Sequence, residues 1–416
     1  MNIKYRLIVM NFLQFAVWGA YLTSMGTFLA NAGFGAVIGW FYAVQGIVSI
    51  FMPALMGIVA DRWIPAQRLL GICHMLAGAL MIAAGVYGCA QELSMAVLFS
   101  LYALSVAFFM PTIALSNSVA FNALTKNGLD TIKDFPPIRV FGTIGFICTM
   151  WAVDLCGFQV SAYQFVVSGV LSIILALYAQ TLPACPVKDK ENGGATLAQA
   201  LGLDAFKLFK NYRMAVFFVF SMFLGVSLQI TNGYANPFIT SFGSIPEYSE
   251  TFGVQHANIL ISLSQISETC CILLIPFCLG RLGIKKVMMI AMFAWVLRFG
   301  LFGAGNPGPG VWMFVLSCVV YGVAFDFFNI SGALFVDKNT DGGIRSSAQG
   351  LFMVMTNGLG ATIGTLVAQA VVNHFVFHAA ETAQLEGWRT CWYIFAIYSL
   401  LVLIMFVFLF KDADAK

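Results

Sequence analysis

Four charged residues lie inside stretches of sequence that are otherwise apolar: Arg139, Glu268, Arg298 and Asp326. Asp326 is the clearest case, because it interrupts the phenylalanine-rich stretch VAFDFFNIS at residues 323–331. A charge at the centre of a membrane helix costs about 2.5–3.5 kcal/mol even on the gentler insertion scale, so such a group usually serves ion or substrate movement. The two carboxylates are therefore candidates for proton coupling, with Arg139 as their charged partner. Arg298 stands alone and indicates only a brace for its own helix.

Polar and aromatic side chains recur around these charges at helical spacing. Positions three, four or seven apart share one face of a helix. The resulting stripes are Gln14, Trp18 and Tyr21; Arg139, Thr143 and Phe146; Gln229, Asn232 and Asn236; Gln265 and Glu268; and Tyr321, Phe325, Asp326 and Asn329. Amides donate and accept hydrogen bonds at once, and aromatic faces stack on flat rings or sugars. The stripes predict a wet cavity for a neutral ligand, although any single amide is explained equally well as a bond between helices.

The elements that must position these side chains are membrane helices. Of 416 residues, 60% are hydrophobic and 9% charged, with a mean hydropathy of +0.88, whereas soluble domains carry about 25% charged residues. Apolar windows of about 20 residues, long enough to cross a bilayer, lie near 7–30, 36–59, 69–89, 95–118, 138–157, 162–182, 214–236, 255–279, 286–305, 311–335, 347–373 and 390–410. The sequence thus predicts an all-α integral membrane protein with twelve transmembrane helices, the eleventh long enough to be tilted or broken at Gly358–Gly360.

The charge distribution predicts the orientation. With the amino terminus inside, nearly every Lys and Arg outside the spans lies on the cytoplasmic side, and Arg389 is the exception. Basic residues are retained on the cytoplasmic side of membrane proteins. Both termini are therefore expected in the cytoplasm, which requires an even number of spans.

The chain shows two related halves. The polar stretch at 183–212 separates six spans from six, and Pro-x-x-x-Gly recurs as PALMG at 53–57 and PFCLG at 276–280. We expect an amino-terminal bundle over 1–182, a cytoplasmic linker over 183–212 and a carboxy-terminal bundle over 213–416. This is the plan of the major facilitator superfamily, in which substrate binds near the bilayer midplane between the repeats.

The loop after the second span supports this plan. The stretch GIVADRWIPAQR carries Gly57, Asp61, Arg62 and Arg68 and resembles the signature loop of that superfamily. Gly57 would permit close approach of a helix, and Asp61 would pair with a basic residue or a helix N-terminus. The alternative is an ordinary basic cytoplasmic loop.

Other function classes lack their signatures. No Gly-Lys-Ser/Thr phosphate loop is present, which argues against an ATP-driven pump, and no paired Cys/His spacing predicts a metal or another cofactor. A membrane-embedded transferase would need a sizeable polar loop, whereas the longest one, at 183–212, is short and basic. We therefore expect a transporter rather than an enzyme. His74, within the third span, is interpreted as a satisfied packing residue rather than a proton relay.

The sequence resembles the nucleoside:proton symporter family of the major facilitator superfamily, the bacterial nucleoside and xanthosine permeases. The likeness covers nearly the whole chain. Its most specific stretches are DFPPIRVFGTIGF (134–146), LGLDAFKLFKN (201–211), LQITN (228–232), SQISET (264–269), YGVAFDFFNISG (321–332) and SAQGLF (347–352). One departure is Tyr234-Ala235, where the family usually has Phe-Gly.

The resemblance implies proton-coupled nucleoside import across the bacterial inner membrane by alternating access. The implied substrate-binding residues are Arg139, Thr143, Phe146, Gln229, Asn232, Gln265, Glu268, Tyr321, Phe325 and Asp326. We expect proton coupling at Glu268, Asp326 and Arg139, with nucleoside, protons and lipid as the partners and a monomer as the functional unit. The alternative is a sugar or glycoside symporter, since the same amides would hold sugar hydroxyls.

Overall fold

The computed structural model describes residues 2–90, 92–185, 203–340 and 345–410, and within these ranges it contains helices and turns but no strand. The amino-terminal helices are α1 (Ile3–Gly19), α2 (Met25–Asn31), α3 (Ile38–Arg62), α4 (Ala66–Gly88), α5 (Met95–Lys126), α6 (Thr131–Leu155) and α7 (Tyr163–Ala179). The carboxy-terminal ones are α9 (Tyr212–Ser241), α10 (Phe252–Gln255), α11 (Ala257–Ala304), α12 (Val311–Lys338), α13 (Arg345–Met353), η5 (Val354–Gly360), α14 (Ala361–Val372), η6 (Asn373–Phe377) and α15 (Gln384–Leu409).

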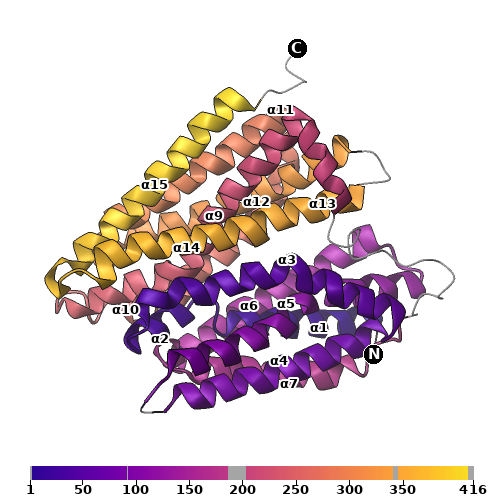
Figure 1. Ribbon diagram of the computed structural model, residues 1–416, viewed down its shortest axis with the longest axis horizontal. Coiled ribbons are helices and arrows are strands. Elements are labelled where there is room, and N and C mark those ends of the chain that lie inside the picture. The colour runs from indigo at the N-terminus through magenta and orange to yellow at the C-terminus, as the bar shows by residue number, and fades with distance from the viewer. Residues whose placement is uncertain (1, 91, 186–202, 341–344, 411–416) are drawn as a thin grey trace. The chain divides into compact units, whose positions relative to one another are not determined.

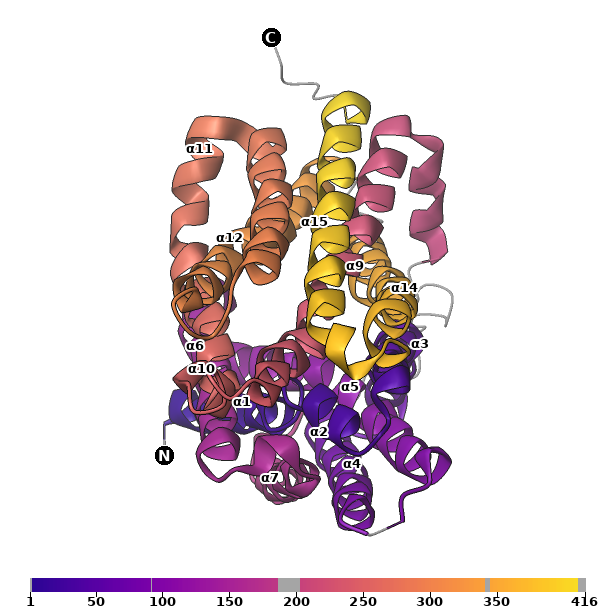
Figure 2. The same ribbon diagram turned by 90° about the vertical axis from the view of Figure 1, so that its left-hand side faces the viewer.

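Every predicted span coincides with helix in the described residues, with three refinements. The first span is interrupted by turns at residues 20–24, between α1 and α2. The eighth and ninth form α11, which doubles back (Figure 2) around Gly283, whose φ of +75° would strain any residue with a Cβ. The eleventh is widened into the π-helix η5 at Val354–Gly360, where the sequence predicts a tilt or a break. Nine helical stretches of the described chain are long and apolar enough to cross a membrane.

The chain packs into two compact units. Unit 1 comprises Met1–Phe28 with Ile47–Leu201, and unit 2 comprises Leu29–Gly46 with Gly202–Lys416. Most of the predicted linker at 183–212 lies outside the described residues. In unit 1, α1 packs against α6, and α4 packs against α5 and α7; in unit 2, α11 packs against α12 and α15, and α9 against η5 and α14 (Figure 1).

Residues Leu29–Gly46 come from the amino-terminal half of the chain but pack in unit 2. The side-chain amides of two residues hold them there. Gln369 accepts from the backbone N–H of Gly39 and donates to the carbonyl of Gly35 at 3.2 Å. Asn373 donates to the carbonyl of Ala36 at 3.0 Å. The buried Tyr234, at the departure from the family pattern, donates its hydroxyl to Gln369 at 3.0 Å. The extra hydroxyl is therefore satisfied inside the unit.

Glycines set the closest contacts between helices. A Cβ at Gly225 on α9 would clash with the carbonyl oxygen of Thr356 in η5, and one at Gly364 on α14 would clash with the backbone of Val226. On α12, a Cβ at Gly322 would lie 2.6 Å from the backbone of Ser267 on α11. Small residues allow membrane helices to approach this closely. Unit 2 thus contains two tightly joined groups, α9 with η5 and α14, and α11 with α12.

Candidate substrate and proton site

The two predicted acids of unit 2 lie on adjacent helices, Glu268 on α11 and Asp326 on α12. The Asp326 side chain is 4% exposed, and its Oδ2 atom makes no hydrogen bond in the described structure. The two carboxyl groups lie near each other and near the hydroxyl of Tyr321. Full ionisation of two such acids in a dry setting is costly. The arrangement therefore suits one exchangeable proton.

An aromatic platform lies beside these acids. The rings of Tyr321 and Phe325 stack with centroids 5.8 Å apart and an interplanar angle of 6°. Trp295 on α11 meets Tyr321 edge-on at 5.9 Å and 88°. Stacked and edge-to-face arrangements at these distances are favourable. Helical spacing places Tyr321 and Phe325 on one face of α12, but the contribution of Trp295 requires a neighbouring helix and was not predicted.

Arg298 is more than the brace that its sequence context indicates. Its side chain is 2% exposed, and Nη1 donates to the carbonyl of Ser317 at 2.8 Å and to Ser264 Oγ at 3.3 Å. Ser317 in return donates its hydroxyl to the Arg298 carbonyl at 2.9 Å. These bonds join α11 to α12, as a brace would. In addition, the guanidinium carbon lies 4.5 Å from the centroid of Tyr321, within the range of a cation–π interaction.

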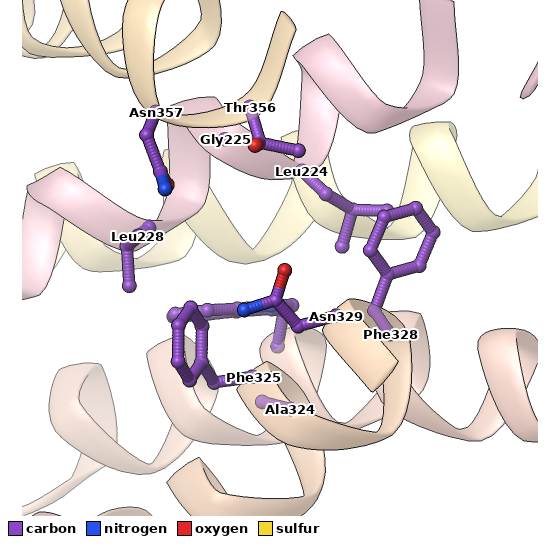
Figure 3. Close-up of a pocket in the computed structure, with 10 residues that line it drawn as sticks. Leu224, Gly225, Leu228, Ala324, Phe325, Phe328, Asn329, Thr356 and Asn357 are labelled. Carbon is purple, nitrogen blue, oxygen red and sulfur yellow. The ribbon is translucent and has the colours of Figure 1, made fainter. Parts of the chain in front are cut away.

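A pocket opens within unit 2 next to this platform. It lies between α9, η5 and α12, with one residue from α11 (Figure 3). The lining residues are Leu224, Gly225, Leu228, Trp295, Ala324, Phe325, Phe328, Asn329, Thr356 and Asn357. Of the predicted binding residues only Phe325 is among them. The polar stripe signals Asn329 in the sequence, whereas Thr356 and Asn357 carry no signal beyond their place beside Gly358.

The predicted amides of unit 2 differ in their hydrogen bonds. Asn232 donates to Gln229 Oε1 at 2.7 Å, so these two are paired along one face of α9. Asn236 donates to Asn258 at 2.7 Å and thus joins α9 to α11. For Asn236 the alternative interpretation from the sequence, a hydrogen bond between helices, is therefore the observed one. Gln265 Oε1 is buried and makes no hydrogen bond in the described structure. An acceptor in that condition is open to a ligand donor.

The remaining predicted binding residues lie in unit 1 on α6. The guanidinium carbon of Arg139 lies 3.7 Å from the centroid of Phe15 on α1, and Phe146 meets Trp18 edge-on at 6.5 Å and 83°. Thr143 is half-buried between them. The contact of Arg139 with Glu268 or Asp326, which belong to the other unit, stays a prediction.

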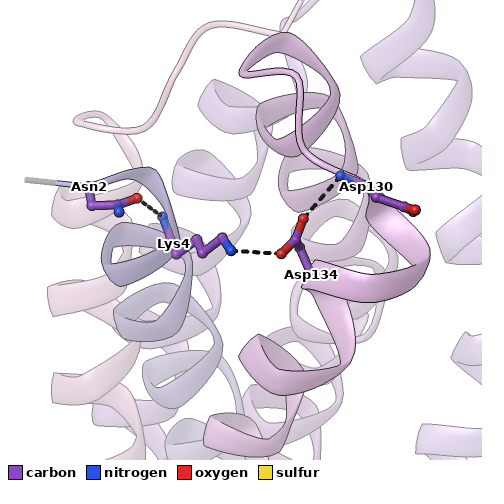
Figure 4. Close-up of polar contacts among 4 residues, drawn as sticks. All are labelled: Asn2, Lys4, Asp130 and Asp134. Atoms are coloured by element: carbon purple, nitrogen blue, oxygen red, sulfur yellow. Dashed lines mark hydrogen bonds and ion pairs between the residues drawn. The ribbon is translucent and has the colours of Figure 1, made fainter.

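An ion pair fixes the start of α6 against α1. Lys4 Nζ lies 2.7 Å from Asp134 Oδ1, and Asp134 Oδ2 accepts from the backbone N–H of Asp130 at 3.0 Å (Figure 4). Asn2 caps α1 by accepting from the backbone N–H of Lys4 at 3.1 Å. Asp134 lies on α6, the helix that carries Arg139, five residues before it.

The predicted conformational loop is described in part. Arg62 ends α3, and the side chain of Asp61 lies outside the described structure. A Cβ at Gly57 would meet no described atom within 4 Å. No described residue approaches Gly57 closely. The predicted helix approach and the function of the loop stay predictions.

The family model described as "Nucleoside H+ symporter" matches residues 1–415. Xanthosine permease of Escherichia coli (strain K12) is 46% identical over 415 residues, which cover 99% of this chain and 96% of that protein. Nucleoside permease NupG of the same organism is 46% identical over 414 residues, with the same coverage. A crystal structure of the nucleoside transporter NupG superposes with a TM-score of 0.90, covering 99% of this chain and all of that one.

These matches confirm the predicted fold, an all-α bundle of the major facilitator type. Together with the apolar helices, they identify a multi-pass membrane protein and a transporter rather than an enzyme. The match over almost the whole chain shows that the protein belongs to the nucleoside H⁺ symporter family.

Proposed function

We propose that the protein imports nucleosides together with protons across the bacterial inner membrane by alternating access, as a monomer with both termini in the cytoplasm. The observation that carries this proposal is the buried Asp326, which lies close to Glu268 and one residue from the aromatic platform of Tyr321 and Phe325. The acids supply a site for the proton, and the stacked rings supply a surface for a planar base.

Each group of side chains has its own function in this proposal. The hydrogen-bonding groups of Gln229, Asn232 and Gln265 hold the nucleoside on unit 2. On unit 1 it is held by the hydrogen-bonding groups of Arg139 and Thr143 and by the aromatic ring of Phe146. Glu268 carries the proton, and Asp326 balances the charge of Arg139 in one conformation of the cycle. Burial disfavours a charged carboxylate, and an arginine partner favours it. Alternation between these two settings would couple proton binding to substrate movement.

The test is uptake of radiolabelled uridine into membrane vesicles with an imposed proton gradient. We expect accumulation that a protonophore abolishes and that sodium removal leaves unchanged. Competition by unlabelled adenosine, xanthosine, uracil and lactose separates the alternatives: the nucleosides should compete and lactose should not. Uptake of lactose-like sugars without uridine uptake would support a sugar or glycoside symporter instead.

A further inference from the structure

The pocket of unit 2 contains two asparagines whose amides face the same space. Asn329 reaches into it from α12, and Asn357 reaches toward it from η5 (Figure 3). Asn329 makes no side-chain hydrogen bond to the described residues, and Asn357 makes only a long contact of 3.9 Å with the sulfur of Met353. Neither side chain is exposed to the degree of a surface residue.

Other asparagines of this chain are satisfied by the protein. Asn11, Asn122, Asn127, Asn339 and Asn373 each donate to a backbone carbonyl at 2.7–3.0 Å. Such bonds are the ordinary use of an amide within a helix bundle. The two pocket amides differ from all five, so their hydrogen-bonding capacity is left for a molecule in the pocket.

Close contacts hold the part of the pocket wall that carries Asn357. The π-helix η5 departs from regular α-helix at Val354–Gly360, and Thr356 donates its hydroxyl to the carbonyl of Phe352 at 2.9 Å. Gly225 brings α9 against the Thr356 carbonyl without an intervening side chain. Short π-helical turns inside α-helices are frequent at functional sites. Here the turn carries Asn357 into the pocket.

The remaining lining residues indicate the kind of occupant. The lining is mostly apolar and aromatic with a few polar groups, as in small-molecule sites, and this composition suits a flat ring system. Phe325 and Trp295 supply aromatic surface. Asparagine recognises a base edge on which a donor lies beside an acceptor, as in its bidentate pairing with adenine.

On these grounds, and resting on the proposed function, we infer that this pocket binds the nucleobase and that Asn329 and Asn357 determine base specificity by hydrogen bonding to its edge. Asn329 and Asn357 would affect which nucleosides bind, and they would not take part in proton coupling. Substrates would be nucleosides whose base presents adjacent donor and acceptor groups.

The experiment compares each nucleoside with an analogue that lacks one hydrogen-bonding group. Binding of adenosine, purine riboside, uridine and 3-methyluridine is measured by calorimetry on the purified full-length protein and on Asn329→Ala and Asn357→Ala. We expect each substitution to weaken adenosine or uridine binding about tenfold, a change of about 1.4 kcal/mol, and to leave the matching analogue nearly unchanged. Asn122→Ala, an exposed asparagine on α5, is the control.

Loss of discrimination in either variant, with normal thermal unfolding, supports the inference. Equal weakening for nucleoside and analogue, or full retention of the preference in both variants, would overturn it while leaving the proposed function intact. If the Ala variants do not fold, Asn329→Leu and Asn357→Leu keep a similar volume and are judged by the same criterion. A wild-type protein that binds none of the four compounds would overturn the proposed function, and this inference with it.

Discussion

The guanidinium of Arg298 lies 4.5 Å from the centre of the Tyr321 ring, while its Nη1 atom donates to the carbonyl of Ser317, four residues before that ring on α12. One side chain thus holds both the backbone of α12 and an aromatic ring of the candidate site. A planar guanidinium stacks and donates at the same time, which a lysine ammonium does not do equally well.

Arg298→Lys should therefore insert into the membrane but bind nucleoside more weakly, by about tenfold, if it loses roughly 1–2 kcal/mol of cation–π and hydrogen-bond energy. Calorimetry with uridine and thermal unfolding in detergent check this. Arg389→Lys is the control, because Arg389 pairs with the exposed Glu386 at 3.1 Å and surface pairs contribute little. If Arg298→Lys binds uridine with unchanged affinity, Arg298 serves only to join α11 to α12.

Asp326→Asn should fold and reach the membrane but lose accumulation of nucleoside against a gradient. The amide has nearly the shape of the carboxylate, so the apolar surroundings of Asp326 accept it, but it neither carries a proton nor balances a charge. Uptake and pH-dependent binding are measured at matched expression, beside Glu268→Gln and Arg139→Ala. Should Asp326→Asn accumulate nucleoside with the pH dependence of the parent, Asp326 is structural.

Gln265→Ala should weaken nucleoside binding, because Gln265 Oε1 is buried without a partner in the described structure. A ligand hydrogen bond lost there costs about 1–3 kcal/mol. Gln229→Ala should also weaken binding, since it removes the acceptor of Asn232 and leaves that amide free to turn away. Calorimetry reports both effects, and unchanged affinity in both variants would assign these glutamines to helix packing.

Gly225→Ala should destabilise the protein, because the new methyl group would clash with the Thr356 carbonyl. Overpacking of this kind typically costs about 1–3 kcal/mol, and thermal unfolding measures it. Gly300→Ala is a matched control in α11, since a Cβ there meets no described atom within 4 Å. Equal melting temperatures for the two variants would contradict the close contact of α9 and η5.

The sequence alone was sufficient to predict the membrane-spanning helices, because the thickness of the bilayer determines their length and apolar composition. It also marked Glu268 and Asp326 as residues worth testing, because a charge inside a membrane helix is costly and usually functional. Spacing, however, relates residues only within one helix. The approach of Trp295 to Tyr321, and of Asn357 to Asn329, depends on which helices pack together and was not predictable from periodicity.

For His74, too, the sequence predicted the kind of environment but not the residues that form it. Interpreted from sequence as a satisfied packing residue, it is fully buried, with Nδ1 2.9 Å from Ser172 Oγ and Nε2 2.8 Å from Gln14 Oε1. Gln14 in turn donates to Thr112 at 2.7 Å. The predicted satisfaction of His74 is confirmed, but the identity of its two partners, which come from α7 and α1, followed only from the packing.

The glycine contacts of unit 2 have a mechanical consequence. Because backbone meets backbone at Gly225 and Gly364, α9 cannot come closer to η5 and α14. The contact at Gly322 limits the approach of α11 to α12 in the same way. The pocket lies between these two tightly joined groups, with Asn357 on one and Asn329 on the other. Its width therefore depends on the separation of these two groups, so binding of a base to both amides would be sensitive to how far apart the two groups lie.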